Sequence, residues 1–122
     1  MKRKTLSFLL VLALVIVLAA PASAATYVGL YSREDTLNGK AYFLSARCTT
    51  YSARASTSYD DTEVLVRTIL TAYYSDGTET IIKRPPTPSH SAASIESGVV
   101  ITNIVASFWI GSTEWGAKVL PG

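Results

Sequence analysis

Apolar and polar side chains alternate along much of the segment 41–110, and this period of two residues predicts β-strands. In the segment 64–74, Arg67 and Thr71 occupy odd positions. The even positions are mainly apolar: Val64, Val66, Leu70, Ala72 and Tyr74. The even side chains are therefore expected to face a core, and Tyr73 is expected to face outward.

The segment 99–110 shows the same alternation and predicts a second strand with one buried face. The side chains expected to point inward are Val100, Ile104, Ala106, Phe108 and Ile110. The side chains expected to point outward are Asn103, Ser107 and Trp109. An error of one residue in phase would exchange the two sets, because successive side chains of a strand lie on opposite faces.

The phase of the alternation changes within the segment 41–59. The even positions are first apolar, with Tyr42, Leu44, Ala46 and Cys48, and then polar, with Ser52, Arg54, Ser56 and Ser58. A strand changes phase only where a residue is inserted, and no Gly, Pro, Asn or Asp marks a tight turn here. We therefore predict a β-bulge near Thr49-Thr50 that bends one long strand, in preference to a hairpin.

Turn signals separate the other expected strands. Asn38-Gly39 and Asp76-Gly77 are dipeptides that favour hairpins, and Pro85-Pro86-Thr87-Pro88 indicates a loop or crossover, because proline has no N–H for a sheet ladder. If Asp76-Gly77 is a two-residue loop, Ala72 pairs with Ile81 and Tyr73 pairs with Thr80.

A helix over residues 63–74 is the main alternative to a strand. Asp60 and Glu63 have the spacing of a capping box, and apolar residues recur every four positions at Leu65, Ile69 and Tyr73. The many β-branched residues in this segment and the hairpin signal that follows it favour a strand. We expect an all-β fold: a small antiparallel β-sandwich, immunoglobulin-like or a partly open barrel, with about six to seven strands.

The N-terminus has the organisation of a secretory signal peptide. Met1 to Thr5 form a basic region, Leu6 to Ala20 form an apolar stretch, and Ala22-Ser23-Ala24 supplies the small residues that signal peptidase requires. A helix of that apolar length reaches only about 23 Å, which is short for a membrane anchor across about 30 Å of hydrocarbon. The sequence predicts cleavage after Ala24, a single domain over residues 25–122, a secreted extracellular protein, and no membrane span after cleavage.

The charge balance excludes a basic nucleic-acid-binding domain. The chain has 11 Lys and Arg against 9 Asp and Glu, and three of these cations, Lys2, Arg3 and Lys4, belong to the leader. The remaining cations are scattered along the sequence, whereas binding to nucleic acid needs clustered ones. Cys48 is the single cysteine, so no intramolecular disulfide can form. It is either a buried small apolar side chain or a site for pairing between chains, and the alternation places its thiol in the core.

Few residues have the chemistry of a catalytic centre. His90 is the only histidine, there is no Gly-x-Ser-x-Gly motif, and no spacing identifies a serine and an acid that would complete a relay. A zinc site needs three or four nitrogen or sulfur ligands, and one His and one Cys do not supply them. The sequence therefore predicts a protein that is not an enzyme, with no catalytic residues, no metal and no cofactor.

Two groups of residues remain as candidate binding sites. Asp60, Asp61 and Glu63 are hard oxygen ligands that could hold calcium, although their spacing is not that of an EF-hand, and a solvated acidic turn is the favoured interpretation. Tyr73, Trp109 and Trp115 are candidate ligand-binding aromatics, with core or interface packing as their alternative role.

The leader, the strands rich in Ser and Thr, the aromatic strand 108–115 and the C-terminal Trp115 occur in an order that resembles small secreted β-sandwich proteins of Gram-positive bacteria, lactococcin-type bacteriocins among them. The resemblance covers the general layout and transfers no site residue. The leading hypothesis is non-catalytic binding or cell-surface interaction. The alternatives are a carbohydrate- or cell-wall-binding module that uses exposed aromatics, with cell-wall polysaccharide or a surface protein as partner, and a secreted bacteriocin-like antagonist.

Overall fold

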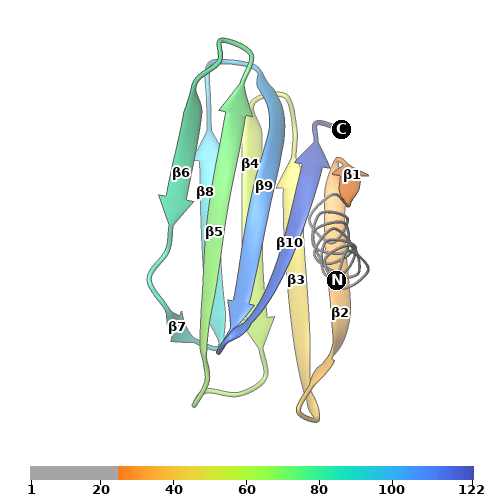
Figure 1. The fold of residues 1–122 in the computed structure, drawn as a ribbon, viewed down its shortest axis with the longest axis vertical. Helices are drawn as coiled ribbons and strands as arrows, with labels where there is room; N and C mark the ends of the chain where they lie inside the picture. The colour runs from red at the N-terminus through yellow and green to blue at the C-terminus, as the bar shows by residue number, and fades with distance from the viewer. Residues whose placement is uncertain (1–24) are drawn as a thin grey trace, which may run out of the picture.

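The computed structural model describes residues 25–122, so the predicted signal peptide and its cleavage site lie outside the described residues. Residues 25–122 form two packed sheets (Figure 1). The six-stranded sheet contains β1 (Thr26–Val28), β10 (Thr113–Leu120), β9 (Ile101–Ile110), β5 (Leu65–Tyr74), β6 (Glu79–Lys83) and β7 (Thr87–Pro88). The four-stranded sheet contains β2 (Leu30–Leu37), β3 (Lys40–Cys48), β4 (Ser52–Tyr59) and β8 (His90–Glu96).

This architecture confirms the predicted all-β sandwich, but the described residues form ten strands, where about six to seven were expected. Two of the extra strands are very short: β1 has three residues and β7 has two. Segments of that length are too short to show an alternating pattern. The segment 63–74 is confirmed as a strand, β5, and the helical alternative is wrong.

The core lies between the sheets and is filled by the side chains that alternation assigned to it. On β5, Val66, Leu70 and Ala72 are buried, and on β3 the whole even set from Tyr42 to Cys48 is buried. Thr68 is also buried, and its hydroxyl lies 2.9 Å from that of Thr57 on the opposite sheet. A hydrogen bond at the centre of the core offsets the cost of burying both hydroxyls.

The change of phase near Thr49 comes from a hairpin, so the predicted β-bulge is wrong. Cys48 of β3 pairs with Ala53 of β4, and the backbone N–H of Thr49 donates to the carbonyl of Ser52 at 2.8 Å. The side chains close this turn in place of glycine or proline, because the Thr49 hydroxyl accepts from the Ser52 N–H at 3.0 Å. Since the two strands are antiparallel, even residues of β3 lie opposite odd residues of β4.

The predicted register of the β5–β6 hairpin is wrong by one residue. Ala72 pairs with Thr80 and Tyr73 with Glu79, because the loop has three residues, Ser75 to Gly77. Gly77 has a φ of 85°, the left-handed conformation that a three-residue hairpin loop requires. At Asn38-Gly39 the predicted hairpin turn is confirmed, and its loop has two residues, since Leu37 pairs with Lys40.

One inward assignment on β9 is also wrong. Ile101 is fully buried and Val100 is exposed, although alternation assigned Val100 to the core. The register with β5 shifts between Tyr73 and Tyr74, whose partners are Asn103 and Ile101. This irregularity inserts one residue into β9 and reverses the phase before it. From Ile104 to Ile110 the predicted inward and outward sets are confirmed.

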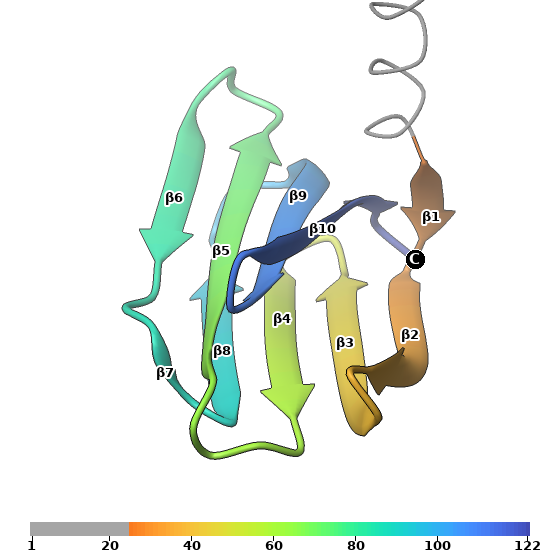
Figure 2. The same cartoon turned by 60° about the horizontal axis from the view of Figure 1, so that its bottom comes forward.

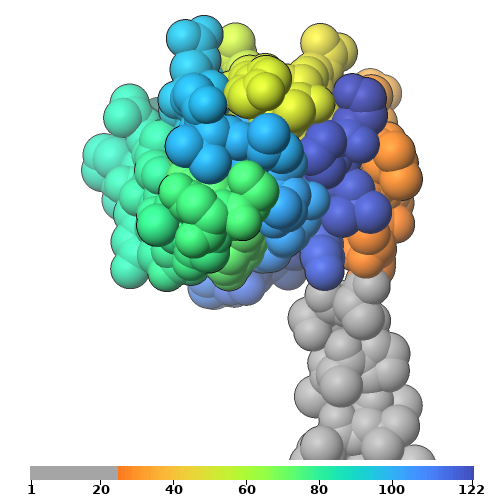
Figure 3. All heavy atoms as spheres, turned by 90° about the horizontal axis from the view of Figure 1, so that it is seen from above, coloured from red at the N-terminus to blue at the C-terminus, as the bar shows by residue number. Residues whose placement is uncertain are grey.

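The first two strands connect the sheets at one end of the sandwich. β1 pairs in parallel with β10 in one sheet, and β2 begins the other sheet directly after Gly29 (Figure 2). Gly29 donates to the carbonyl of Leu120 at 2.8 Å and accepts from the N–H of Cys48 at 3.0 Å. Figure 3 looks onto this end, where the β3–β4 turn (yellow) lies beside the β8–β9 connection (light blue). Backbone bonds from Ser97 and Ile101 to that turn hold the two together.

Cys48 is expected to react slowly with a thiol reagent while the protein is folded. Its side chain is fully buried, and burial raises the pKa of the thiol from 9.0 to about 11. At neutral pH this leaves about a hundredfold less of the reactive thiolate than an unperturbed cysteine has. Labelling with a chromogenic disulfide should accelerate sharply when denaturant is added, and equal rates before and after denaturation would contradict the inward placement.

Candidate functional site

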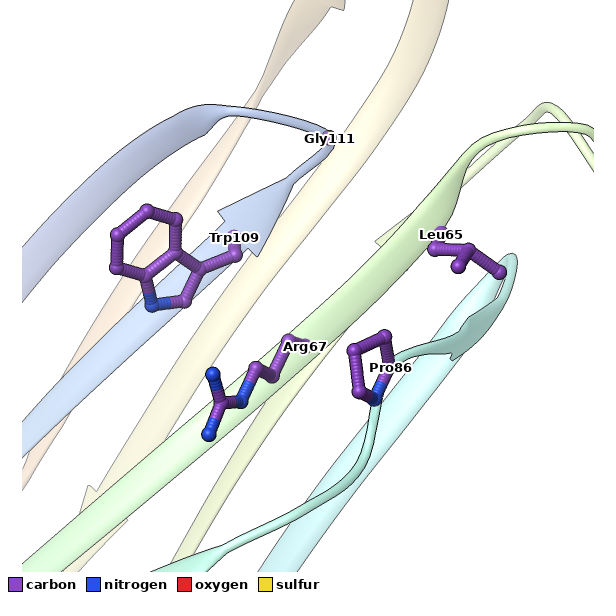
Figure 4. A pocket seen from close by; sticks show the side chains of 5 residues that line it. All are labelled: Leu65, Arg67, Pro86, Trp109 and Gly111. Atoms are coloured by element: carbon purple, nitrogen blue, oxygen red, sulfur yellow. The ribbon is translucent and has the colours of Figure 1, made fainter.

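A hollow on the outer face of the six-stranded sheet is the strongest candidate site. It has a volume of about 350 Å³ and is lined by Leu65, Arg67, Pro86, Trp109 and Gly111; we call it the Trp109 hollow. Figure 4 shows the side chains of four of these residues arranged around it. The volume is at the lower end of the range for small-molecule sites. The hollow is mostly apolar, with Arg67 as its only charged residue.

The pairing of three strands brings these residues together. Arg67 of β5 lies directly opposite Trp109 of β9, and both side chains point away from the core because they occupy odd positions. At the turn after β9, the Gly111 N–H donates to the carbonyl of Leu65 at 2.9 Å. The result is an aromatic ring and a guanidinium side by side on a flat sheet.

A proline-rich bulge forms the remaining wall. β5 pairs first with β6, up to Lys83, and then with β7, from Thr87. Three residues connect these strands opposite only two residues of β5, so Pro86 is displaced from the ladder. Arg67 holds the displaced segment through its Nε, which donates to the carbonyl of Arg84 at 3.1 Å. Pro85 and Pro86 therefore lie in a loop, one of the two predicted alternatives, and Pro86 also lines the hollow.

The side chains that line the Trp109 hollow offer hydrogen-bond donors and no acceptors. The Nε1 of Trp109 is buried and has no hydrogen-bond partner. Within residues 25–122, Arg67 forms no ion pair with a carboxylate. Figure 4 shows the nitrogen-bearing edge of the indole turned toward Arg67. Indole and guanidinium groups can only donate, so a ligand that binds here must supply acceptor oxygens.

The three predicted aromatic residues do not come together. Tyr73 shares the outer face with Trp109, but it lies six residues further along β5 than Arg67, which is about 20 Å away at the rise of a strand. Trp115 packs against the core, and its ring centroid lies 4.8 Å from that of Tyr42. A joint platform of these aromatics is therefore absent from the described structure, and only Trp109 contributes to the hollow.

A lysine holds the acidic turn that contains Asp60, Asp61 and Glu63. The Nζ of Lys40 lies 2.9 Å from Oδ2 of Asp61, and the backbone N–H of Glu63 donates to Oδ1. These hydrogen bonds lower the pKa of Asp61. Asp60, Asp61 and Glu63 line one surface hollow together with Lys40. Within residues 25–122, however, no three His, Cys, Asp or Glu side chains are arranged to hold a metal ion. The Lys40 ammonium competes with a cation for Asp61, so the geometry favours the solvated acidic turn, and calcium ligation by Asp60, Asp61 and Glu63 stays an untested alternative.

His90 lies at the start of β8 and is exposed. Its Nδ1 is 3.0 Å from the hydroxyl of Ser58, its register partner on β4. The two side chains are on the outer face of the four-stranded sheet, away from the Trp109 hollow. The expectation that the protein is not an enzyme stays a prediction.

Sequence reasoning found Trp109 and missed Arg67 and Pro86 as its neighbours. Arg67 was assigned to the outer face, but nothing short-range indicates that it lies opposite Trp109. The strand pairing that joins them connects positions 42 residues apart. The Pro85-Pro86 pair was the one signal in the sequence for this hollow. Prolines interrupt the pairing of an edge strand, and the interruption exposes side chains of the neighbouring strand.

Comparison with known proteins found no family model, no curated protein and no solved structure that matches this chain. Residues 25–122 include no helix with the length and apolar character needed to span a lipid bilayer.

Proposed function

We propose that this protein is an exported, non-catalytic binding domain whose contact surface is the outer face of the six-stranded sheet, centred on the Trp109 hollow. The observation that carries the proposal is the combination of a half-buried indole with an unpaired Nε1 and an arginine without a carboxylate partner in one apolar hollow. An unpaired buried donor costs about 1–3 kcal/mol. A ligand that displaces the atoms covering Nε1 and supplies an acceptor would recover part of this energy.

The chemistry of the hollow favours a saccharide as ligand. A sugar ring presents C–H groups that pack on an indole face, and its ring and hydroxyl oxygens accept hydrogen bonds from the Arg67 guanidinium. The strand pairing fixes the backbone positions of Trp109 and Arg67 next to each other before binding, which reduces the entropy lost on association. Cell-wall polysaccharide is therefore the partner that we propose, and a surface protein is the alternative that the test separates.

Trp109→Ala is expected to abolish retention of the protein on insoluble cell-wall polysaccharide, with a loss of affinity of about 30-fold or more, the effect of removing a central aromatic anchor. Purified protein would be incubated with washed cell walls and with purified polysaccharide, and the bound fraction measured by sedimentation. Tyr73→Ala is the matched control, because Tyr73 is exposed on the same face but outside the hollow.

A Trp115→Phe background leaves Trp109 as the single tryptophan, so that binding can also be followed by indole fluorescence. Soluble oligosaccharide should then shift the emission of Trp109. Equal retention of Trp109→Ala and the unsubstituted protein would refute the proposed site. Retention on whole walls that is lost after protease treatment of those walls would instead identify a surface protein as the partner.

A further inference from the structure

We propose that Arg47 and Arg54 form a second binding site, for the phosphate groups of a linear polyanion, on the outer face of the four-stranded sheet. The two residues are direct register partners on β3 and β4, and both side chains are exposed. Direct cross-strand neighbours have Cβ atoms about 4.5–5.5 Å apart. No other register pair in residues 25–122 places two cations opposite each other.

Within residues 25–122, no carboxylate forms an ion pair with either arginine. The ion pairs within residues 25–122 are Arg33 with Asp35 and Lys40 with Asp61, and neither involves the two arginines. Like charges directly opposite each other destabilise a sheet. A domain whose other cations are dispersed thus keeps two guanidinium groups together at a cost that a bound anion would offset.

The surroundings of the pair suit an oxyanion. Both arginines line a hollow of about 220 Å³ together with Ser52 and Ser94. The Ser52 hydroxyl is bonded to that of Thr49 at 2.6 Å, which leaves the Ser94 hydroxyl as the neutral side-chain donor for a ligand. The adjacent row across the sheet consists of small residues: Ser32, Ser45, Ser56 and Ala92. These short side chains leave the arginine forks open to a ligand that lies flat on the sheet.

Glu96 is the acidic group that lines this hollow. It lies on β8 two residues beyond Ser94, the register partner of Arg54, and forms no ion pair with either arginine. Its carboxylate repels an anion and so lowers the affinity of the site. Neutralising Glu96 should therefore strengthen binding, whereas neutralising either arginine should weaken it.

A polymer of phosphates fits the pair better than a single ion. A guanidinium binds phosphate through two parallel hydrogen bonds, which a lysine cannot reproduce. Because both arginines are exposed, water and salt screen each contact, and one phosphate gains little. Successive phosphates along a chain can contact the two guanidinium groups together. Once the first phosphate is bound, the second is held at a high effective concentration near the other arginine.

The test is a calorimetric titration of the purified protein with inorganic polyphosphate at low salt. Arg47→Gln and Arg54→Gln are each expected to weaken binding by about tenfold, and Arg54→Lys by less, because charge is kept while the fork is lost. Glu96→Gln should tighten binding. Lys118→Gln is the matched control, since it removes one exposed positive charge from the opposite sheet and should leave the affinity unchanged.

Thermal unfolding of the same variants separates binding from folding. Arg54→Gln removes one of two like charges that face each other, so its melting temperature should stay unchanged or rise. Weaker binding by this variant then cannot be attributed to unfolding.

Failure of the unsubstituted protein to bind polyphosphate, or an equal loss of affinity in Lys118→Gln, would overturn the proposal. Binding to phosphatidylglycerol vesicles without binding to polyphosphate would overturn it as well, because the source would then be a lipid headgroup. Trp109→Ala should bind polyphosphate normally, which makes this site independent of the proposed saccharide site.

Discussion

Phe108→Ala is expected to lower the free energy of unfolding by about 3–5 kcal/mol, the cost of a large cavity in a packed core. Phe108 is fully buried between the sheets, and its ring centroid lies 5.7 Å from that of Tyr31 on the opposite sheet. Trp109→Ala, at the next position of the same strand, should cost less than half as much, because the indole lies on the outer face of the six-stranded sheet.

Urea unfolding followed by circular dichroism measures both variants under the same conditions. The midpoint should fall strongly for Phe108→Ala with little change in the dependence of the free energy on urea concentration, which indicates an unchanged fold. The comparison distinguishes the two faces of β9. Phe108→Ala should lower the free energy of unfolding, whereas Trp109→Ala should mainly remove the proposed binding. A Trp109→Ala variant as unstable as Phe108→Ala would mean that Trp109 belongs to the core.

Alternation in the sequence was sufficient to assign the faces of the long strands. β3, β5 and most of β9 each bury one face, so their apolar residues recur every two positions, and a strand is the only regular element with that period. The two-sheet architecture followed from the same pattern, because several half-buried strands must cover one another's apolar faces.

Alternation does not determine which residue lies opposite which. The register at Asp76-Gly77 depended on whether the loop has two or three residues, and both are compatible with the same dipeptide. The β3–β4 hairpin was missed because Thr49 and Ser52 close it through their side chains, without the residues that usually mark a turn. The bulge near Thr102 was hidden because Val100 and Ile101 are both apolar.

The errors in pairing explain why the sites were only partly predicted. With one bent strand over the segment 41–59, Arg47 and Arg54 would lie far apart along it, whereas the hairpin places them opposite each other. Arg67 was likewise visible as an outward residue but not as the neighbour of Trp109. A candidate site on a sheet is a property of cross-strand pairs, and those pairs depend on contacts that are distant in sequence.

Gly29→Ala is expected to lower the free energy of unfolding by about 2–3 kcal/mol, because it introduces backbone strain and a steric clash at once. Gly29 has a φ of 75°, which L-residues other than glycine rarely adopt, and it directs the chain from β1 into β2. A Cβ added at Gly29 would lie 3.3 Å from Cα of Gly122, tighter than an ordinary van der Waals contact. The substitution therefore disturbs the backbone bonds that join Gly29 to Leu120 and to Cys48, and with them the link between the two sheets.

Two other glycines supply matched controls for the urea unfolding of this variant. Gly39 has a φ of 77° but nothing within 4 Å of an added Cβ, so Gly39→Ala measures backbone strain alone and should cost about 1–2 kcal/mol. Gly98 has neither a positive φ nor a close neighbour, so Gly98→Ala should be nearly neutral. The difference between Gly29→Ala and Gly39→Ala reports the contact with Gly122. If Gly29→Ala were as stable as Gly98→Ala, the close junction between β1, β2 and the C-terminal segment would be wrong.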